Sequence, residues 1–251
     1  MKKIFHLTLL LLAVIFTINL QAQVKKKVVK KPAARTITKK AAPKAAVKPN
    51  NPVLADTSET RVKISTDMGE IIVRLSNKTP LHRDNFIKLV NEHFYDSLLF
   101  HRVIDGFMIQ GGDPQSKNAP TGVMLGMGDV GYTIPAEFDT TLYHKKGALA
   151  AARNSNPEKA SSGCQFYIVD GKTYNDDQLD MMEQSTRVKY NSAKRMTYKM
   201  VGGTPGLDMN YTVFGQVESG LDIITKIATV PKDGNNRPLT DVHMKMEIVK
   251  K

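Results

Sequence analysis

Four residues of one mostly apolar stretch have side chains of the kinds that build a binding site: Arg102, Phe107, Met108 and Gln110. The arginine offers a rigid, permanently charged fork of donors. The three even-numbered residues have the spacing that points side chains to one side of an extended chain. A bend at Gly106 brings the phenylalanine into the same concavity. The stretch therefore predicts an apolar floor with one fixed cation and one amide at its rim.

This stretch, Phe100–Asp113, reads F-H-R-V-I-D-G-F-M-I-Q-G-G-D. It closely resembles the signature of the cyclophilin-type peptidyl-prolyl cis/trans isomerases, roughly F-H-R-V-I-x-G-F-M-x-Q-G-G-D. A match of this length, with functional and glycine positions in register, is far more specific than a short motif. The alternative is a buried core strand with an incidental arginine.

Three later segments extend the resemblance to most of the chain from 61 to 251: Gly147–Arg153, Ser162–Val169 and Thr204–Gly215. They are similar to the family's G-x-L-A-M-A-R, S-Q-F-F-I and W-L-D-G-x-H-V-V-F-G segments. This chain departs from the family pattern at five positions: Ala151 for Met, Cys164 for Ser, Tyr167 for Phe, Gly206 for Trp and Tyr211 for His.

Two of these departures bear on ligands. Tyr167 keeps the aromatic ring of the proline pocket and adds a hydroxyl group. Gly206 stands where the family carries the tryptophan associated with cyclosporin, and the chain has no tryptophan at all. We therefore expect weak cyclosporin binding with catalysis retained.

The resemblance implies a role for each matched residue. Rotation about an Xaa-Pro bond has a barrier of about 18–20 kcal/mol and needs no nucleophile. Arg102 would hydrogen-bond near the prolyl nitrogen and carbonyl, and Gln110 would hold the substrate backbone or orient Arg102. The implied catalytic residues are Arg102, Gln110 and Phe107. The implied substrate-binding residues are Met108, Ala152, Arg153, Gln165, Tyr167, Leu207 and Tyr211. No cofactor and no metal are implied.

The implied fold is mainly β: a closed eight-stranded antiparallel barrel capped by two helices. Local patterns agree with such elements. Alternating or capped apolar runs predict strands at 61–65, 70–75 and 242–248 and helices beginning at Pro80 and spanning 221–228. His82 and His93 flank the first helix without ligand partners at metal spacing, so both are predicted to lie at the surface.

Residues 171–204 fall outside the compact family core. Asn175 can cap a helix, and the later residues are partly amphipathic, so we predict a helical insertion. It is either a solvated decoration or a rim for a partner or substrate.

Two further sequence features do not indicate a functional site. Gly126–Gly131 spells G-x-G-x-x-G, but extended chain and a proline follow instead of a helix, so a dinucleotide site is rejected. Cys164, the only cysteine, excludes an internal disulfide and lies in an apolar context typical of a buried, inert thiol.

The N-terminal part differs from the rest. A basic start and an apolar run predict a signal peptide over 1–22, with an uncleaved anchor as the alternative. The Lys/Ala/Pro-rich segment 23–60 lacks aromatic residues and predicts a disordered linker. Residues 1–60 hold 12 of the 36 basic residues and 2 of the 24 acidic ones, so residues 61–251 are nearly neutral. The net charge of +12 therefore predicts weak contact of the linker with an anionic envelope surface, not nucleic-acid binding.

These features predict an exported, periplasmic, monomeric isomerase with a domain over 61–251, acting on proline-containing polypeptides. Two alternatives remain: a peptide-binding chaperone without turnover, and a tethered envelope adaptor on the same fold. A hydrolase has little support, because no Ser or Cys lies in a nucleophile context.

Overall fold

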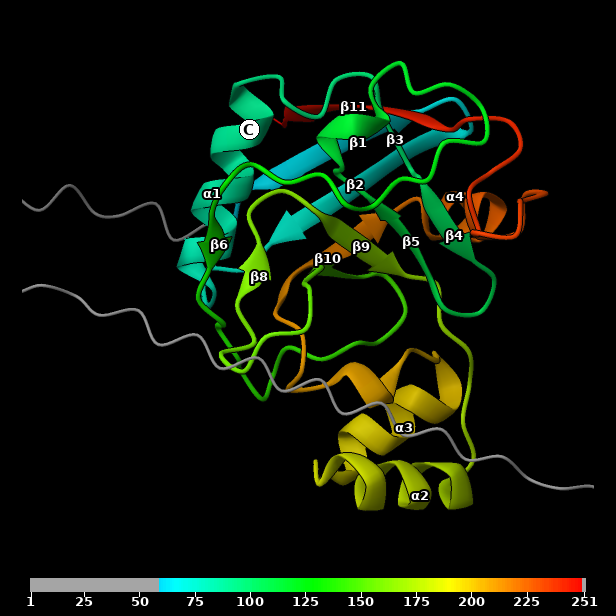
Figure 1. Cartoon of the computed structure of the whole chain (residues 1–251). Coiled ribbons are helices and arrows are strands. Elements are labelled where there is room, and N and C mark those ends of the chain that lie inside the picture. Colours follow the sequence, from blue (N-terminus) through cyan, green and yellow to red (C-terminus); the bar gives the residue numbers. More distant parts are fainter. Residues whose placement is uncertain (1–58, 250–251) are drawn as a thin grey trace, which may run out of the picture. The chain divides into compact units, whose positions relative to one another are not determined.

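The computed structural model describes residues 59–249 (Figure 1). The predicted signal peptide lies outside these residues, as does nearly all of the predicted linker. The strands are β1 (Arg61–Thr66), β2 (Gly69–Leu75), β3 (Leu98–Leu99), β4 (Arg102–Ile104), β5 (Met108–Gly111), β6 (Thr133–Ile134), β7 (Ala148–Ala151), β8 (Ser161–Ser162), β9 (Phe166–Val169), β10 (Val213–Ser219) and β11 (His243–Ile248). The helices are α1 (Pro80–Asn91), α2 (Asp176–Thr186), α3 (Ser192–Met200) and α4 (Leu221–Ala228), with 3₁₀ turns η1 (Pro114–Ser116) and η2 (Pro205–Leu207).

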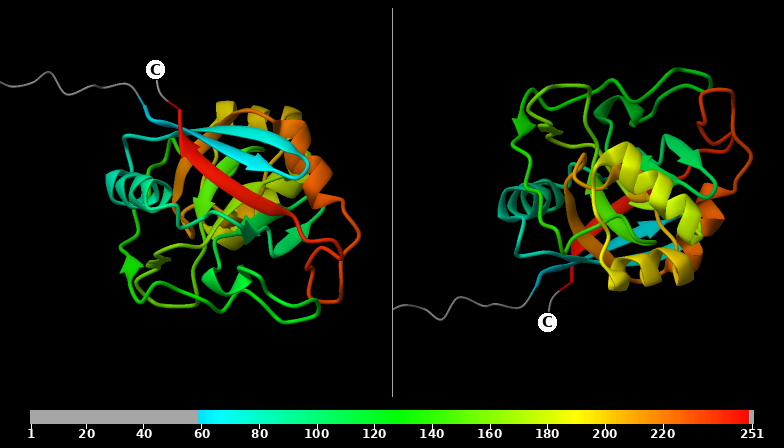
Figure 2. Two further views of the ribbon diagram at one scale, coloured as in Figure 1. Left: turned by 90° about the horizontal axis from the view of Figure 1, so that it is seen from above. Right: turned by 90° about the horizontal axis from the view of Figure 1, so that it is seen from below.

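Nine of the strands form one antiparallel sheet in the order β3-β11-β1-β2-β10-β7-β9-β5-β4, and β6 pairs with β8 separately. The alternation in β1 and β2 is explained by burial of one face, with Val62 and Ile64 fully buried. Gly69 begins β2 with a φ of 136°, a conformation that the tight turn before it requires. The mainly β prediction and the first two strands are confirmed. In Figure 2, β11 lies beside β1, as their pairing requires.

The prediction of a closed eight-stranded barrel is wrong, because the sheet is curled but open. Its two edge strands, β3 and β4, are consecutive in the chain, with only Phe100 and His101 between them. β3 pairs with β11 and β4 with β5, and no ladder within residues 59–249 joins β3 to β4. The Phe100 N–H donates to the carbonyl of Val242, so this backbone turns to the loop before β11. The sheet ends are thus connected by the chain itself and not by hydrogen-bonded strands.

Strands β5, β7 and β9 are buried on both faces, and successive residues serve different clusters. Ile109, Leu149 and Ile168 point into the main core of the sheet. Their neighbours Met108 and Tyr167 point to the opposite face, where a second, smaller apolar cluster forms. The two-residue period of a strand thus separates residues that stabilise the fold from residues that line the outer face.

Helix α1 begins at Pro80 as predicted, but the Thr79 hydroxyl makes no cap bond. Glu137 caps the helix instead, because its carboxylate accepts from the backbone N–H groups of Leu81 (3.0 Å) and His82 (2.9 Å). The His82 ring is 2% exposed, so the prediction of a surface histidine is wrong. The buried ring lies 2.7 Å from Glu137 Oε2 through Nδ1 and 3.0 Å from Ser161 Oγ through Nε2, which satisfies both ring nitrogens.

The 171–204 segment is helical, as predicted. Asn175 and Gln178 form a capping box at the start of α2. Leu179, Tyr190 and Tyr198 form a small apolar core between the two helices. In Figure 1, α2 and α3 lie together at one end of the domain, away from α1 and α4.

The two ends of this segment meet at a pair of glycines. Lys172 and Gly203 form a β-bridge, and a Cβ on Gly171 would lie 2.5 Å from the Cα of Gly203. A side chain at this neck would force the backbones apart. None of the helices within residues 59–249 is long and apolar enough to cross a membrane.

Candidate active site

The signature stretch forms a hairpin, not a single strand. Gly106 lies in its turn with a φ of 64°, and Arg102 on β4 pairs directly with Gln110 on β5. Side chains opposite each other on a ladder project to one face, so the two predicted polar groups are neighbours. A pocket of about 170 Å³ lies beside them, which we call the Arg102 pocket. Nine of the ten predicted site residues line it: Arg102, Phe107, Met108, Gln110, Ala152, Arg153, Tyr167, Leu207 and Tyr211.

The Arg102 guanidinium is half-buried and lacks an acidic partner among residues 59–249. Its contacts are Gln110 Oε1, 3.4 Å from Nη1, and the Met108 sulfur at 4.0 Å. Burial lowers the pKa of Arg102, yet an arginine stays charged at neutral pH. Most of its N–H donors therefore remain available at the pocket.

Gln165 lies just behind the pocket and orients Gln110. The Gln110 amide donates to Gln165 Oε1 (3.1 Å), and Gln165 Nε2 donates to the carbonyls of Gly126 (3.0 Å) and Gly128 (2.7 Å). A Cβ on Gly128 would lie 2.1 Å from Asp113 Oδ1, so this glycine allows close packing. The prediction that these glycines serve a loop is confirmed, since β6 follows them and not a helix.

The Tyr167 hydroxyl belongs to a buried polar network that no sequence pattern predicted. It lies 2.9 Å from His144 Nε2, and His144 Nδ1 lies 2.8 Å from Asp208 Oδ1. Tyr198 of α3 donates to Asp208 Oδ2 at 2.7 Å. Burial raises the pKa of Tyr167 well above its usual range, so its hydroxyl is a protonated donor. The network holds the tyrosine that departs from the family pattern.

Tyr211 and Arg153 form another wall of the pocket. The Arg153 guanidinium lies 4.8 Å from the centre of the Tyr211 ring, and its Nε donates to the Asn210 carbonyl at 2.8 Å. The Tyr211 ring meets Tyr167 edge-on at 5.9 Å. Arg153 is thus engaged by backbone and ring, in contrast to Arg102.

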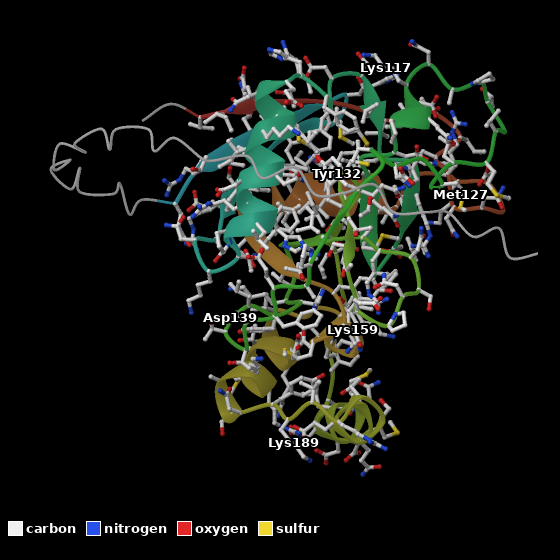
Figure 3. All side chains as sticks on the ribbon, turned by 60° about the vertical axis from the view of Figure 1, so that its left-hand side comes forward. Lys117, Met127, Tyr132, Asp139, Lys159 and Lys189 are labelled. Atoms are coloured by element: carbon white, nitrogen blue, oxygen red, sulfur yellow. The ribbon has the colours of Figure 1, made fainter. Side chains whose placement is uncertain are left out.

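A larger groove of about 420 Å³ adjoins the Arg102 pocket. It shares Gln110, Ala152 and Arg153 with the pocket and continues along the loop that carries Met127 and Tyr132. Figure 3 labels both of these residues on the loop before β6. The pocket and the groove therefore border each other at these three side chains.

Ser161, His82 and Glu137 have the spacing of a nucleophile, base and acid, at 3.0 and 2.7 Å. Ser161 is fully buried, however, and Glu137 is occupied in capping α1. This arrangement is structural. Within residues 59–249 no group of three or more His, Cys, Asp or Glu side chains is placed to hold a metal ion. Cys164 is 3% exposed, which confirms the predicted buried thiol, and burial raises its pKa to about 11.

Comparisons with known proteins agree on one family. The family model described as "Cyclophilin type peptidyl-prolyl cis-trans isomerase/CLD" matches residues 61–248. A Staphylococcus aureus (strain COL) protein named as a peptidyl-prolyl cis-trans isomerase is 36% identical over 185 residues, which is 73% of this chain and 88% of that protein. A Streptococcus pyogenes protein named as a bifunctional phosphatase/peptidyl-prolyl cis-trans isomerase is 35% identical over 187 residues, 72% of this chain but 37% of that protein.

Solved structures show the same fold at lower identity. A crystal structure of a Cryptosporidium parvum cyclophilin type peptidyl-prolyl cis-trans isomerase superposes with a TM-score of 0.56 at 22% identity, covering 77% of this chain and 99% of that one. One determined in the presence of the dipeptide Ala-Pro gives a TM-score of 0.55 at 23% identity, with 76% and 99% covered. With the family match over most of its length, this chain belongs to the cyclophilin-type peptidyl-prolyl cis-trans isomerase family.

Proposed function

We propose that this chain accelerates Xaa-Pro rotation in exported polypeptides by holding the proline ring in the Arg102 pocket. The observation that supports this best is the half-buried guanidinium with no carboxylate partner among the described residues, at a pocket that Phe107, Met108 and Leu207 also line. Such a cation is costly to desolvate unless a ligand uses its donors.

The proposed mechanism is preferential binding of the twisted amide. As the C–N bond rotates, resonance is lost and the prolyl nitrogen regains its lone pair. Arg102 donates to the prolyl amide in this twisted state more strongly than in the planar one, which lowers the barrier. Phe107, Met108, Tyr167 and Leu207 hold the ring, and Gln110, itself oriented by Gln165, directs Arg102 or binds the substrate backbone.

The proposed setting is the periplasm, with export directed by residues 1–22 and a basic linker over 23–60 in weak contact with anionic envelope surfaces. The support for this comes from the sequence pattern. A monomer is proposed, with unfolded or partly folded proline-containing proteins as clients.

The test is cis/trans exchange of a short Ala-Pro peptide, measured by NMR exchange spectroscopy with the whole chain. We expect acceleration by the wild type and a loss on the order of 10²-fold in Arg102→Ala, the usual cost of removing a transition-state donor. Arg102→Lys should restore little, because an ammonium lacks the planar fork. Arg61→Ala is the control, since Arg61 pairs with Glu218 and does not line the pocket.

Two results would redirect the proposal. If the wild type changes the NMR chemical shifts of the peptide without accelerating its cis/trans exchange, the chain is a peptide-binding module. Full activity in Arg102→Ala would refute the assigned mechanism.

The proposed surface contact of the linker has a separate test. It is supported if the chain binds anionic vesicles and deletion of 23–60 abolishes that binding without changing the exchange rate.

A further inference from the structure

A second cavity borders the Arg102 pocket through different residues. This Met182 groove, of about 460 Å³, lies between the β4–β5 turn, η2 and the 171–204 segment. Phe107 and Leu207 line both the groove and the Arg102 pocket, so the two cavities share an apolar wall. The groove of about 420 Å³ described above shares other residues with the pocket. A polypeptide with its proline in the pocket can therefore extend into either groove.

The helical segment supplies the outer wall of the Met182 groove. Met182 belongs to α2, and a Cβ on Gly206 would lie 3.1 Å from its sulfur and 3.7 Å from its methyl carbon. Gly206 does not have a positive φ, so its backbone conformation does not require glycine. Its missing side chain instead leaves room for the methionine and for the groove.

A polar group beside the groove also lacks a partner. Thr204 lines the groove and is 5% exposed, and its hydroxyl makes no hydrogen bond among residues 59–249. It is the N-cap residue of η2 but makes no side-chain cap bond. Buried hydroxyls are rarely left without a partner. Because this oxygen is itself buried, a chain entering the groove would reach it only if the Thr204 side chain rotated.

We propose that the Met182 groove is a subsite for an apolar side chain of the same polypeptide whose proline occupies the Arg102 pocket. This inference rests on the proposed function. The side chain lies close to the proline in the bound sequence, because the two cavities share Phe107 and Leu207 as a wall. A thioether and two aromatic rings, from Met182, Tyr174 and Phe107, favour an apolar group. The charged lining residues Asp105 and Lys172 have opposite signs, so a charged side chain gains no net electrostatic attraction from them.

The test compares proline peptides of alanine background that carry one phenylalanine at successive positions before or after the proline. Dissociation constants come from NMR titration and rates from exchange spectroscopy, so binding is measured whether or not turnover occurs. At one placement we expect the wild type to bind about 3- to 10-fold more tightly than it binds the all-alanine peptide, the range for partial burial of an aromatic ring.

The variants are Met182→Gln, Gly206→Leu and the control Met181→Gln. Met181 is the neighbouring methionine of α2, 61% exposed and not part of the groove. The preference should disappear in the first two and persist in the control, while exchange of the all-alanine peptide stays unchanged in all three. The phenyl ring should also show nuclear Overhauser contacts to the Met182 methyl group of the wild type.

Different failures are distinguishable. The subsite alone is overturned if the wild type isomerises the all-alanine peptide but shows no preference for a phenylalanine peptide. It is also overturned if the Met182→Gln variant retains that preference. A lack of isomerisation overturns the proposed function, and the titrations and methyl contacts still decide whether the groove binds the side chain.

Discussion

Replacing Tyr198 by Phe removes one oxygen atom from the buried network that connects α3 with the Arg102 pocket. Tyr198 is fully buried and Asp208 is 3% exposed. Burial raises the pKa of Tyr198 far above its usual range, so its hydroxyl is protonated and donates to Asp208. The other carboxylate oxygen accepts from the backbone N–H (2.9 Å) and Nδ1 (2.8 Å) of His144. With Nδ1 donating, Nε2 accepts from Tyr167.

The expected cost follows from the charge of the acceptor. A hydrogen bond to a charged group contributes about 1.5–3 kcal/mol, and Asp208 keeps two bonds from His144 in the variant. We therefore expect Tyr198→Phe to lower the free energy of unfolding by about 2 kcal/mol. In a domain of this size that corresponds to a melting temperature lower by about 4–8 °C.

The measurement is urea denaturation with thermal melting, and Tyr143→Phe is the matched control. The Tyr143 ring packs on Tyr198 at 5.6 Å, and its hydroxyl donates to Thr197 Oγ1 at 3.1 Å, a neutral and partly exposed bond. Its loss should cost at most about 1 kcal/mol. Equal stability of Tyr198→Phe and wild type, or equal effects of the two substitutions, would refute the network as a stabilising element.

Three further predictions concern other parts of the domain. His101 is 3% exposed with no ring hydrogen bond among the described residues, and burial lowers its pKa from 6.5 to about 4. Because the neutral ring is favoured in the folded state, the free energy of unfolding should be at its full value above pH 6.5 and fall by about 3 kcal/mol as the pH drops to about 4. Denaturation of His101→Leu should lack this pH-dependent loss. Cys164, whose pKa is raised to about 11, should resist a thiol reagent at pH 8 in the folded chain and react in urea. Gly112→Ala places a Cβ 2.3 Å from the Cys164 carbonyl oxygen and should cost about 2–4 kcal/mol in denaturation, whereas Gly122→Ala, with nothing within 4 Å, should cost about 1 kcal/mol.

The sequence by itself predicted the elements that have local signals and nine residues that the structure places around the Arg102 pocket. These signals depend on residues a few positions apart, so they can be read from the sequence. They are the alternation of apolar and polar residues in strands, the proline at the start of α1 and the capping residue Asn175. The long signature match brought together residues from 102 to 211, and nine of the ten predicted residues line one pocket.

Tertiary structure decided what depends on distant partners. Whether the sheet closes depends on a hydrogen-bonded ladder between its two edge strands. β3 and β4 are consecutive in the chain, yet within residues 59–249 they form no ladder with each other, because β3 pairs with the distant β11 and β4 pairs with β5. His82 is buried because Glu137 and Ser161, 55 and 79 residues away, satisfy its nitrogens. No periodicity marks His144 as the partner of Asp208, 64 residues later, or Met182 as the neighbour of Gly206. Local sequence specifies backbone conformation and which face is apolar, whereas the pairing of buried polar groups exists only once the chain has folded.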